Sequence, residues 1–436
     1  MEFLRYLVYK TTNRSLLIKN AGTVAEIKTN AEANINIVGA IRKYKAKHGL
    51  HKLAEIFYRY KPLFLAFRSN SNMRPIINKI RKLAVKYHKA MRKDYLNDVT
   101  AMISRGEKIN EKVLQTELSR VSIFRKVRLA QALSYRNNDE VTSILYKIRN
   151  GKSYATEFAA GNNKSSVQDT LEMVLDSIVG DVKKNVFGKK IYIPEYIEYA
   201  MPATEKQFTG DLPSGTCITV DRNMVFGVHW EDQGKQRIDL DLSLISANDA
   251  KIGWDASYRN RGRTALFSGD LTSAPLPRGA SELFYLDEAD ESYYIMYINY
   301  FNFSESIPVP FKILVAKERV SSNFERGYMV NPNNVIGIAK TKLDVKQKML
   351  GLVITTAENI KFYFNEAELG RGITSRGNQY TRHARKYLFD YASSTISLND
   401  ILVRAGAVLV DDNDEADIDL SPEALEKDTI ISLLTQ

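Results

Sequence analysis

The sequence predicts an α+β multidomain protein, with an all-α helical N-terminal half, then an antiparallel β-sandwich and a short helical C-terminal extension. Three observations predict this class. Before about residue 190, apolar residues recur every three or four positions, which is the period of an amphipathic helix. Between about residues 215 and 366, short runs rich in β-branched and aromatic residues follow one another, as in a sandwich. Near the C-terminus the helical pattern returns.

Four segments are expected from these patterns. They are a basic, mainly helical domain (1–200), the β-sandwich (201–372), a helical extension (373–410) and an acidic tail (411–436). A chain of 436 residues is long enough for two or three domains that each bury a core.

In the first segment, the stretches FLRYLVYK and SLLIKN are expected to be short β-like pieces, and helices are expected after them. Pro62 should kink or restart a helix, Pro75 should lie in a first turn, and Ser166 should cap a helix. The expected helices cover residues 31–47, 51–67, 74–96, 111–133, 139–148 and 166–186.

Strands are expected from residue 191 onward, beginning with a short extended piece at Ile191. Beyond Gly370, a basic helix is expected from Arg376 to Tyr391, and a capped short helix from Ser397 to Gly406. The ten runs expected to form the sandwich are TCITV, MVFGVHW, RIDLDLSLIS, TALFSG, SELFYLD, SYYIMYINYF, FKILVAK, NVIGIAK, MLGLVITT and IKFYFNE.

Cysteine and hydropathy point to a cytoplasmic location. The one cysteine, Cys217, rules out an internal disulfide, fits a reducing compartment and is expected to be a packing residue. No apolar run approaches the roughly 20 residues of a membrane span, and the N-terminus does not resemble a secretory signal. His48 and His51 lie three apart without further ligands at a metal-site spacing, so a surface role is expected for them. The other histidines, His88, His229 and His383, are expected to be structural.

Charge is distributed unevenly along the chain. Residues 1–200 contain 37 Lys and Arg against 18 Asp and Glu, a formal charge of +19, and the remainder carries −8. Such a basic segment attracts polyanions. The tyrosines Tyr44, Tyr58, Tyr60, Tyr87 and Tyr95 among these basic residues permit base stacking, whereas the alternative places them in helix cores beside solvated lysines. No named nucleic-acid motif decides between the two. The acidic tail is expected to compete for the same basic surface.

Acidic side chains between Arg237 and Glu282 form a candidate calcium site. Asp239 and Asp241 stand two apart, so in a strand they point to one face. Calcium takes six to eight oxygen ligands, several of them carboxylates. The alternative is that these side chains are solvated turn residues and caps, since the EF-hand pattern is absent. The other oxygen-bearing residues of the stretch are Asp249, Asp255, Asn260, Asp270 and Glu282.

The motifs of this region suggest a family. The order DLDLS, a Gly-Trp-Asp/Tyr-Arg-Asn segment, FSGDLTSAP, RGASELFYLD and SYYIMYINYF resembles the tellurium-resistance (TerD-type) stress-response family, in its diverged TerD-like members with a preceding helical region. The resemblance runs from about Gly215 to about Gly370. It implies a β-sandwich that binds calcium through acidic loop residues and has no established catalytic activity.

Carried over by position, the resemblance implies that the metal ligands are Asp239, Asp241, Asp270 and Glu282. The sequence departs from the family where an Asn and a run of acids usually follow the Gly-Asp, because it has Leu271 to Pro275 there. The resemblance therefore implies that one of the family's two metal positions is weakened or missing.

The function expected from these features is a non-enzymatic, calcium-binding scaffold protein of the TerD-like stress-response type. Catalytic motifs such as a phosphate-binding Gly-Lys loop, a nucleophile elbow or a His-Glu-x-x-His helix are absent from the sequence. Protein partners or self-assembly are expected. Two alternatives stay open. One is a structural component of a viral or phage particle or other large assembly, located in the virion, and the other is nucleic-acid binding through residues 1–200.

Overall fold

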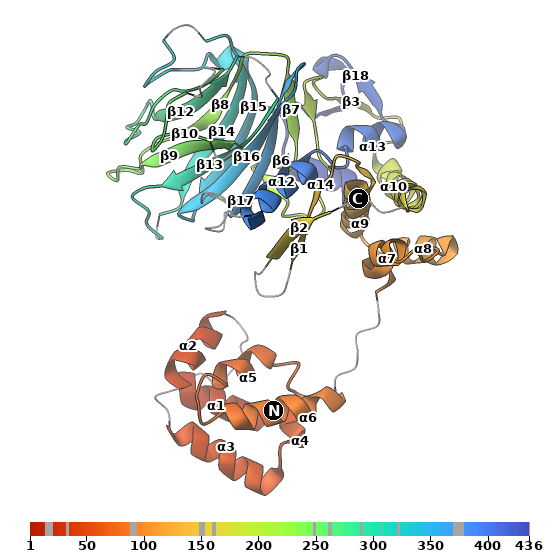
Figure 1. Ribbon diagram of the computed structural model, residues 1–436, viewed down its shortest axis with the longest axis vertical. Coiled ribbons are helices and arrows are strands. Elements are labelled where there is room, and N and C mark those ends of the chain that lie inside the picture. The colour runs from red at the N-terminus through yellow and green to blue at the C-terminus, as the bar shows by residue number, and fades with distance from the viewer. Residues whose placement is uncertain are drawn as a thin grey trace. The chain divides into compact units, whose positions relative to one another are not determined.

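Contacts in the computed structural model divide the chain into two compact units, Met1–Lys93 and Asp94–Gln436. The structure describes residues 1–436 except 14–20, 32–34, 88–93, 148–152, 159–162, 247–249, 260–263, 288–290, 306, 321–322, 369–378 and 436. Figure 1 labels the elements of both units. The division at residue 93 lies far from the boundary near residue 200 that the sequence pattern suggests.

The first unit is helical throughout its described residues, and the expected β-like start is wrong. Leu4, Leu7 and Val8 are all buried, so the apolar residues of the first segment form a helical stripe. The stretch SLLIKN lies outside the described residues. The elements are α1 (Glu2–Thr12), α2 (Ala21–Ala31), α3 (Ile35–His48), α4 (His51–Glu55), α5 (Lys61–Phe67), α6 (Arg74–Ala84) and the 3-10 turn η1 (Val85–Tyr87).

Prolines begin two helices of this unit, as expected. Pro62 lies in the first turn of α5 and Pro75 in the first turn of α6, where a missing N–H costs nothing. The single helix expected over 51–67 is therefore two helices, α4 and α5. Phe57 and Phe64 are buried on either side of this break, with ring centroids 5.2 Å apart.

Four helices open the second unit and share one core with its strands. Asn110 accepts a hydrogen bond from the Val113 N–H and so starts a helix. The expected helix over 111–133 is two helices, and Ser166 lies inside a helix whose N-cap is Asn163, so the capping prediction is wrong. The helices are α7 (Tyr95–Ser104), α8 (Glu111–Leu118), α9 (Ile123–Asn137) and α10 (Lys164–Val186).

The helix expected over 139–148 is also wrong, because this segment forms a hairpin. Strand β1 (Ser143–Lys147) pairs antiparallel with β2 (Ser153–Glu157), and α12 (Gln379–Ala392) packs against both strands. The Thr142 N–H donates to Asp390 of that helix over 3.2 Å. A partner 248 residues away therefore decides the conformation of a short, ambiguous apolar run.

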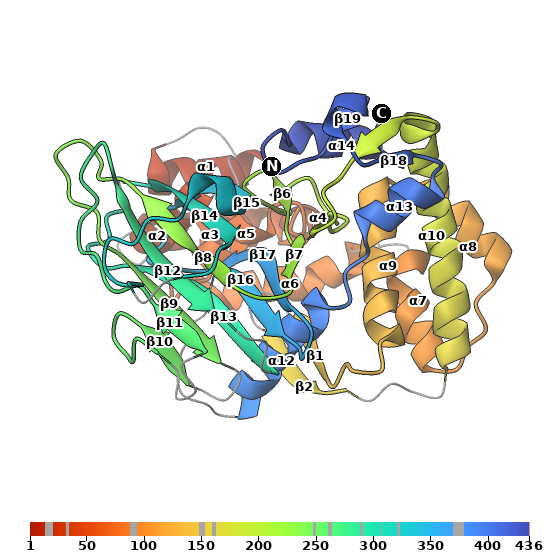
Figure 2. The same ribbon diagram turned by 90° about the horizontal axis from the view of Figure 1, so that it is seen from above.

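Strands dominate after residue 190, and all ten runs expected to be strands are strands. One sheet has the order β10-β9-β13-β16-β17-β7-β4 and the other β11-β12-β8-β14-β15 (Figure 2). The bounds are β4 (Ile197–Glu198), β7 (Cys217–Val220), β8 (Met224–Trp230), β9 (Leu240–Ser246), β10 (Lys251–Gly253), β11 (Ala265–Phe267), β12 (Ala280–Leu286), β13 (Ser292–Tyr300), β14 (Val309–Lys317), β15 (Val335–Leu343), β16 (Gln347–Thr355) and β17 (Ile360–Glu368).

Side chains from the two sheets meet in the core. The rings of Phe226 on β8 and Phe362 on β17 have centroids 5.4 Å apart. Gly337 on β15 has no room for a side chain, because a Cβ there would lie 2.2 Å from Cδ1 of Ile218 on β7. Every strand pair within these two sheets is antiparallel. The α+β class is therefore confirmed.

Residues 411–435, which belong to the segment expected to be an acidic tail, fold onto the second unit. Strands β18 (Val408–Val410) and β19 (Ile418–Asp419) pair in parallel with β3 (Lys190–Tyr192), and α14 (Lys427–Thr435) packs against α10. Leu420, Ile430 and Leu434 are buried. The acidic residues thus occupy the solvent side of a segment whose apolar residues belong to the core.

Two smaller expectations concern the C-terminal helices and Cys217. Ser397 caps α13 (Leu398–Arg404) by accepting the Asp400 N–H, and Gly406 follows with φ 88°, as expected. Helix α12 matches the expected basic helix. Cys217 is a buried free thiol whose pKa is raised by burial to about 11, consistent with a packing residue. None of the described helices has the length and apolar character needed to cross a membrane.

Candidate metal centre

The centre begins with two aspartates at the start of β9. Asp239 precedes the strand and Asp241 lies within it, and each is only 3% exposed. Leu240 and Leu242 alternate with them and belong to the main core. The expectation that both carboxylates lie on the same side of a strand is consistent with this alternation.

A third aspartate reaches the same place from the other sheet. Asp270 follows β11 after a turn at Gly269, which has φ 110°, a value that favours glycine. One carboxylate oxygen from each of Asp239, Asp241 and Asp270 lies within 4.8 Å of the other two. The structure therefore brings together three of the four side chains that the family resemblance suggests as ligands.

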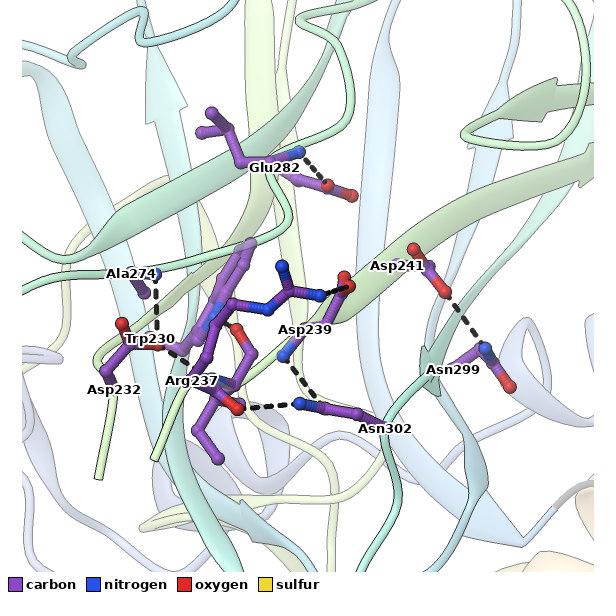
Figure 3. A network of polar contacts seen from close by, with 11 residues as sticks. Trp230, Asp232, Arg237, Asp239, Asp241, Ala274, Glu282, Asn299 and Asn302 are labelled. Carbon is purple, nitrogen blue, oxygen red and sulfur yellow. Dashed lines mark hydrogen bonds and ion pairs between the residues drawn. The ribbon is translucent and has the colours of Figure 1, made fainter. Parts of the chain in front are cut away.

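Neighbouring side chains hold two of these carboxylates in position (Figure 3). Asn299, the partner of Asp241 in the register of β13 and β9, donates from Nδ2 to Asp241 Oδ2 over 3.0 Å. Asn302 accepts the Asp239 N–H over 3.1 Å. The Arg237 guanidinium lies 3.3 Å from Asp239 Oδ2. Sequence reasoning missed these three residues, because only the pairing of β13 with β9 places the asparagines beside the acids.

Two oxygens of the cluster have no hydrogen-bond partner among the described residues. They are Oδ1 of Asp239 and Oδ1 of Asp270, and both are shielded from solvent. A buried carboxylate oxygen without a partner is costly, because burial removes its hydration without replacing it. Three carboxylates with two such oxygens match the needs of a hard cation, whose positive charge would supply the missing interaction.

The electrostatics agree with a site that lacks positive charge. Burial raises the pKa of Asp241 to about 7, helped by the nearby carboxylates of Asp239 and Asp270 and opposed by the Asn299 hydrogen bond. Burial also raises the pKa of Asp239, while Arg237 lowers it. A raised carboxyl pKa is expected where burial and neighbouring negative charges both disfavour ionisation.

Glu282, the fourth residue suggested by the resemblance, lies outside the three-carboxylate cluster. It is completely buried, and both of its oxygens accept backbone N–H groups, Oε2 from Leu242 over 2.7 Å and Oε1 from Leu271 over 2.8 Å. Burial raises the pKa of this carboxyl well above its ordinary value, although the two backbone donors act in the opposite direction. Its contacts tie β12 to β9 and to the loop that carries Asp270.

Asp232, which the sequence analysis did not select, connects the same loops through hydrogen bonds. Asp232 Oδ1 accepts the N–H groups of Ile238 and Ala274 over 2.8 and 3.0 Å, and the Trp230 indole N–H donates to the Ile238 carbonyl over 3.0 Å. The loop residues after Asp270, where the family usually has acids, therefore contribute backbone groups to fix the loop.

Of the remaining candidates, only Asp255 belongs to the described residues, and it does not join the cluster. Asp255 forms an ion pair with Lys251, and Asp249 and Asn260 lie outside the described residues. The four described histidines are also absent from the cluster. His48 and His51 are exposed, as expected, and His229 contacts the Ser281 hydroxyl, in keeping with a structural role.

Comparisons with known proteins give no family assignment. No protein-family model matches the sequence, and no curated protein matches it. Among solved structures, the crystal structure of a protein of unknown function, SAV2460, is similar over 38% of this chain and 96% of that chain, with 12% identity and a TM-score of 0.26. A likeness of this size supports no conclusion about function.

Proposed function

We propose that this chain is a non-enzymatic, calcium-binding scaffold protein of the TerD-like type, in which the two large sheets form the TerD-like sandwich. The observation that carries the proposal is the set of partnerless, buried oxygens of Asp239 and Asp270 beside Asp241. The cluster offers carboxylate oxygens and no imidazole or thiolate, a donor set that suits calcium or magnesium better than zinc.

Calcium would be held by Asp239, Asp241 and Asp270, with Glu282 as a positioning residue. When bound, the ion would supply positive charge to three converging carboxylates. Asp239 and Asp241 belong to the start of β9 in the seven-stranded sheet, whereas Asp270 follows β11 in the five-stranded sheet. Binding would therefore link the two sheets at one edge and rigidify the loops there, which is a structural role that requires no catalysis.

Calorimetric titration of chelator-treated protein with CaCl2 tests the proposal. We expect saturable binding below millimolar calcium and weaker binding of magnesium, because calcium tolerates irregular loop geometry better. Asp241→Asn and Asp270→Asn should each weaken binding at least about tenfold, since each removes a charged ligand. Asp344→Asn, an exposed acid outside the cluster, is the matched control and should bind like the unaltered chain.

A misfolded variant would lose calcium affinity, so a variant that is expected to gain affinity tests the site without this ambiguity. Arg237 is exposed and places positive charge 3.3 Å from Asp239, so it competes electrostatically with a bound cation. Arg237→Gln should raise calcium affinity by roughly threefold to tenfold, on the scale of about 1 kcal/mol for such a pair. The cluster is not a metal site if the unaltered chain does not bind calcium. The same conclusion follows if the calcium affinities of both aspartate variants equal that of the unaltered chain.

A further inference from the structure

The positive charge of this protein belongs to its first unit. Residues 1–93 contain 21 Lys and Arg against 4 Asp and Glu, a formal charge of +17, whereas residues 94–436 contain 41 against 47, a charge of −6. The excess that the sequence pattern spreads over residues 1–200 is therefore confined almost entirely to one compact helical unit. Self-repulsion on this scale opposes folding of so small a unit and is relieved by a polyanionic partner.

The basic residues lie on the surface of the unit. Fourteen of them are exposed, and four of these lie in the second half of α3, after its buried residues. The exposed set is Arg5, Lys10, Lys28, Arg42, Lys43, Lys45, Lys47, Lys52, Arg59, Arg74, Lys79, Arg81, Lys82 and Lys86. Four acids cannot neutralise this set by ion pairing, so most of its charge is available to a ligand.

Exposed tyrosines stand among these cations. Tyr6, Tyr9, Tyr58 and Tyr87 are 43%, 46%, 38% and 41% exposed. Of the tyrosines named from the sequence, Tyr58 and Tyr87 therefore lie at the surface, whereas Tyr60 is buried, as the core alternative expects. Lys10 lies over the Tyr6 ring at 5.8 Å. Nucleic-acid bases stack on exposed aromatic rings of this kind.

Aromatic contacts join two of the basic helices into one surface. Phe3 of α1 stacks on Tyr44 of α3 with ring centroids 4.0 Å apart and an interplanar angle of 17°. Tyr6 lies beside Phe3, and His48 beside Tyr44, with centroids at 6.1 and 5.1 Å. Tyr6 of α1 is thus connected through Phe3 to Tyr44, which lies between Lys43 and Lys45 in the sequence of α3.

We propose that the first unit binds nucleic acid without sequence preference, through phosphate contacts from α1 and α3 and base stacking on the exposed tyrosines of α1. The pairing of cations with aromatic rings favours single strands, because bases in a duplex are not free to stack on protein. The inference is independent of calcium binding, since the acidic cluster and the basic surface belong to different units.

The test uses the full chain and fluorescence anisotropy with labelled 20-nucleotide single-stranded RNA, single-stranded DNA and duplex DNA, all of mixed sequence. We expect binding at 50 mM salt, tighter for single strands than for duplex. The variant Lys43→Gln/Lys45→Gln/Lys47→Gln should bind single strands roughly tenfold more weakly. Its log affinity should fall less steeply with log salt, by about 2 in slope, because each lost phosphate contact removes about 0.7.

Matched variants in the second unit separate a specific surface from total charge. Lys312→Gln/Lys340→Gln/Lys342→Gln removes the same charge from exposed positions of β14 and β15 and should leave binding unchanged. Tyr6→Ala/Tyr9→Ala should weaken single-strand binding about tenfold, on the scale of one lost stacking contact, and the similarly exposed pair Tyr258→Ala/Tyr293→Ala should not. Circular dichroism verifies that each variant is folded.

Three results would overturn the inference. The first is absence of binding to all three nucleic acids at 50 mM salt. The second is an equal loss of binding in the α3 and β14/β15 triple variants, which would mean non-specific attraction to the whole chain. The third is binding to vesicles that contain phosphatidylserine without binding to nucleic acid, which would make the basic surface a membrane-binding one.

Discussion

Asp241 is the residue on which the pH behaviour of the second unit depends most directly. Its carboxyl has a pKa raised to about 7, mainly by burial, against an ordinary value near 3.9. A carboxyl whose pKa is higher in the folded than in the unfolded state stabilises the fold while it is protonated. That contribution is complete below about pH 4 and is lost as pH rises through 7.

We therefore predict that calcium and protons compete at this residue. Calcium affinity should fall as pH drops from 7.5 to 5.5, because the ligand must release its proton to bind the metal. Titration calorimetry in two buffers with different ionisation enthalpies measures both the affinity and the protons released. With chelator present, the free energy of unfolding should instead fall as pH rises from 5 to 7.5. An affinity that is constant over this range would contradict the prediction.

Glu282 stabilises the fold and is not one of the proposed metal ligands. Its two oxygens accept two buried backbone N–H groups. A Gln at this position has an NH2 group in place of one oxygen, so this NH2 donor would face one of the backbone N–H donors. We predict that Glu282→Gln lowers the free energy of unfolding by about 2 kcal/mol. Urea unfolding followed by tryptophan fluorescence measures this. The exposed Glu231→Gln control should stay within about 0.5 kcal/mol, and equal effects of the two changes would refute the role.

At the scale of elements, the C-terminal segment is a structural part of the second unit. Helix α14 buries Ile430, Leu433 and Leu434, and Asn185 of α10 donates to the Leu433 carbonyl over 2.9 Å. The Tyr199 hydroxyl donates to the Leu420 carbonyl. Removing residues after Val410 would expose these contacts, so such a truncation tests folding rather than competition for a basic surface.

A single substitution measures what this element contributes. We predict that Ile430→Ala lowers the free energy of unfolding by about 2–5 kcal/mol, because it leaves a cavity at a fully buried site. Glu426→Gln, at an exposed position before α14, should change it by less than about 0.5 kcal/mol. If both variants unfold at the same urea concentration as the unaltered chain, α14 does not contribute to the stability of the unit.

At the scale of the whole molecule, the two units should respond differently to salt. The first carries +17 on 93 residues, so screening its self-repulsion should stabilise it, whereas the second carries only −6. Both tryptophans, Trp230 and Trp254, lie in the second unit. Fluorescence therefore reports that unit alone, while circular dichroism reports the helices of both.

We predict that raising NaCl from 20 to 300 mM shifts part of the helical unfolding transition, followed by circular dichroism at 222 nm, to higher temperature. The tryptophan transition should move much less. Sodium sulfate at equal ionic strength is the control. Screening should give the same shift with both salts, because it depends on ionic strength, whereas binding of a particular anion would give different shifts. Transitions that move together would mean that charge repulsion does not limit the first unit.

The sequence by itself determined the features that depend on neighbouring residues. All ten runs expected to be strands are strands, because alternation and β-branched content act over a few positions. The helix starts at Pro62 and Pro75 and the Ser397 cap are equally local. The common side of Asp239 and Asp241 follows from the strand period alone. The first helix was ambiguous, because FLRYLVYK is too short to separate a period of two from one of 3.6.

Only the tertiary structure decided which distant residues meet. Asp270 joins Asp239 and Asp241 because strands of different sheets come together, and Asn299 reaches Asp241 through the register of β13 with β9. The same is true of Glu282, whose partners are backbone groups of other segments, and of residues 411–436, whose acidic composition conceals buried leucines and isoleucines. Local patterns carry no information about pairing over tens of residues, since that choice is made by the packing of the whole unit.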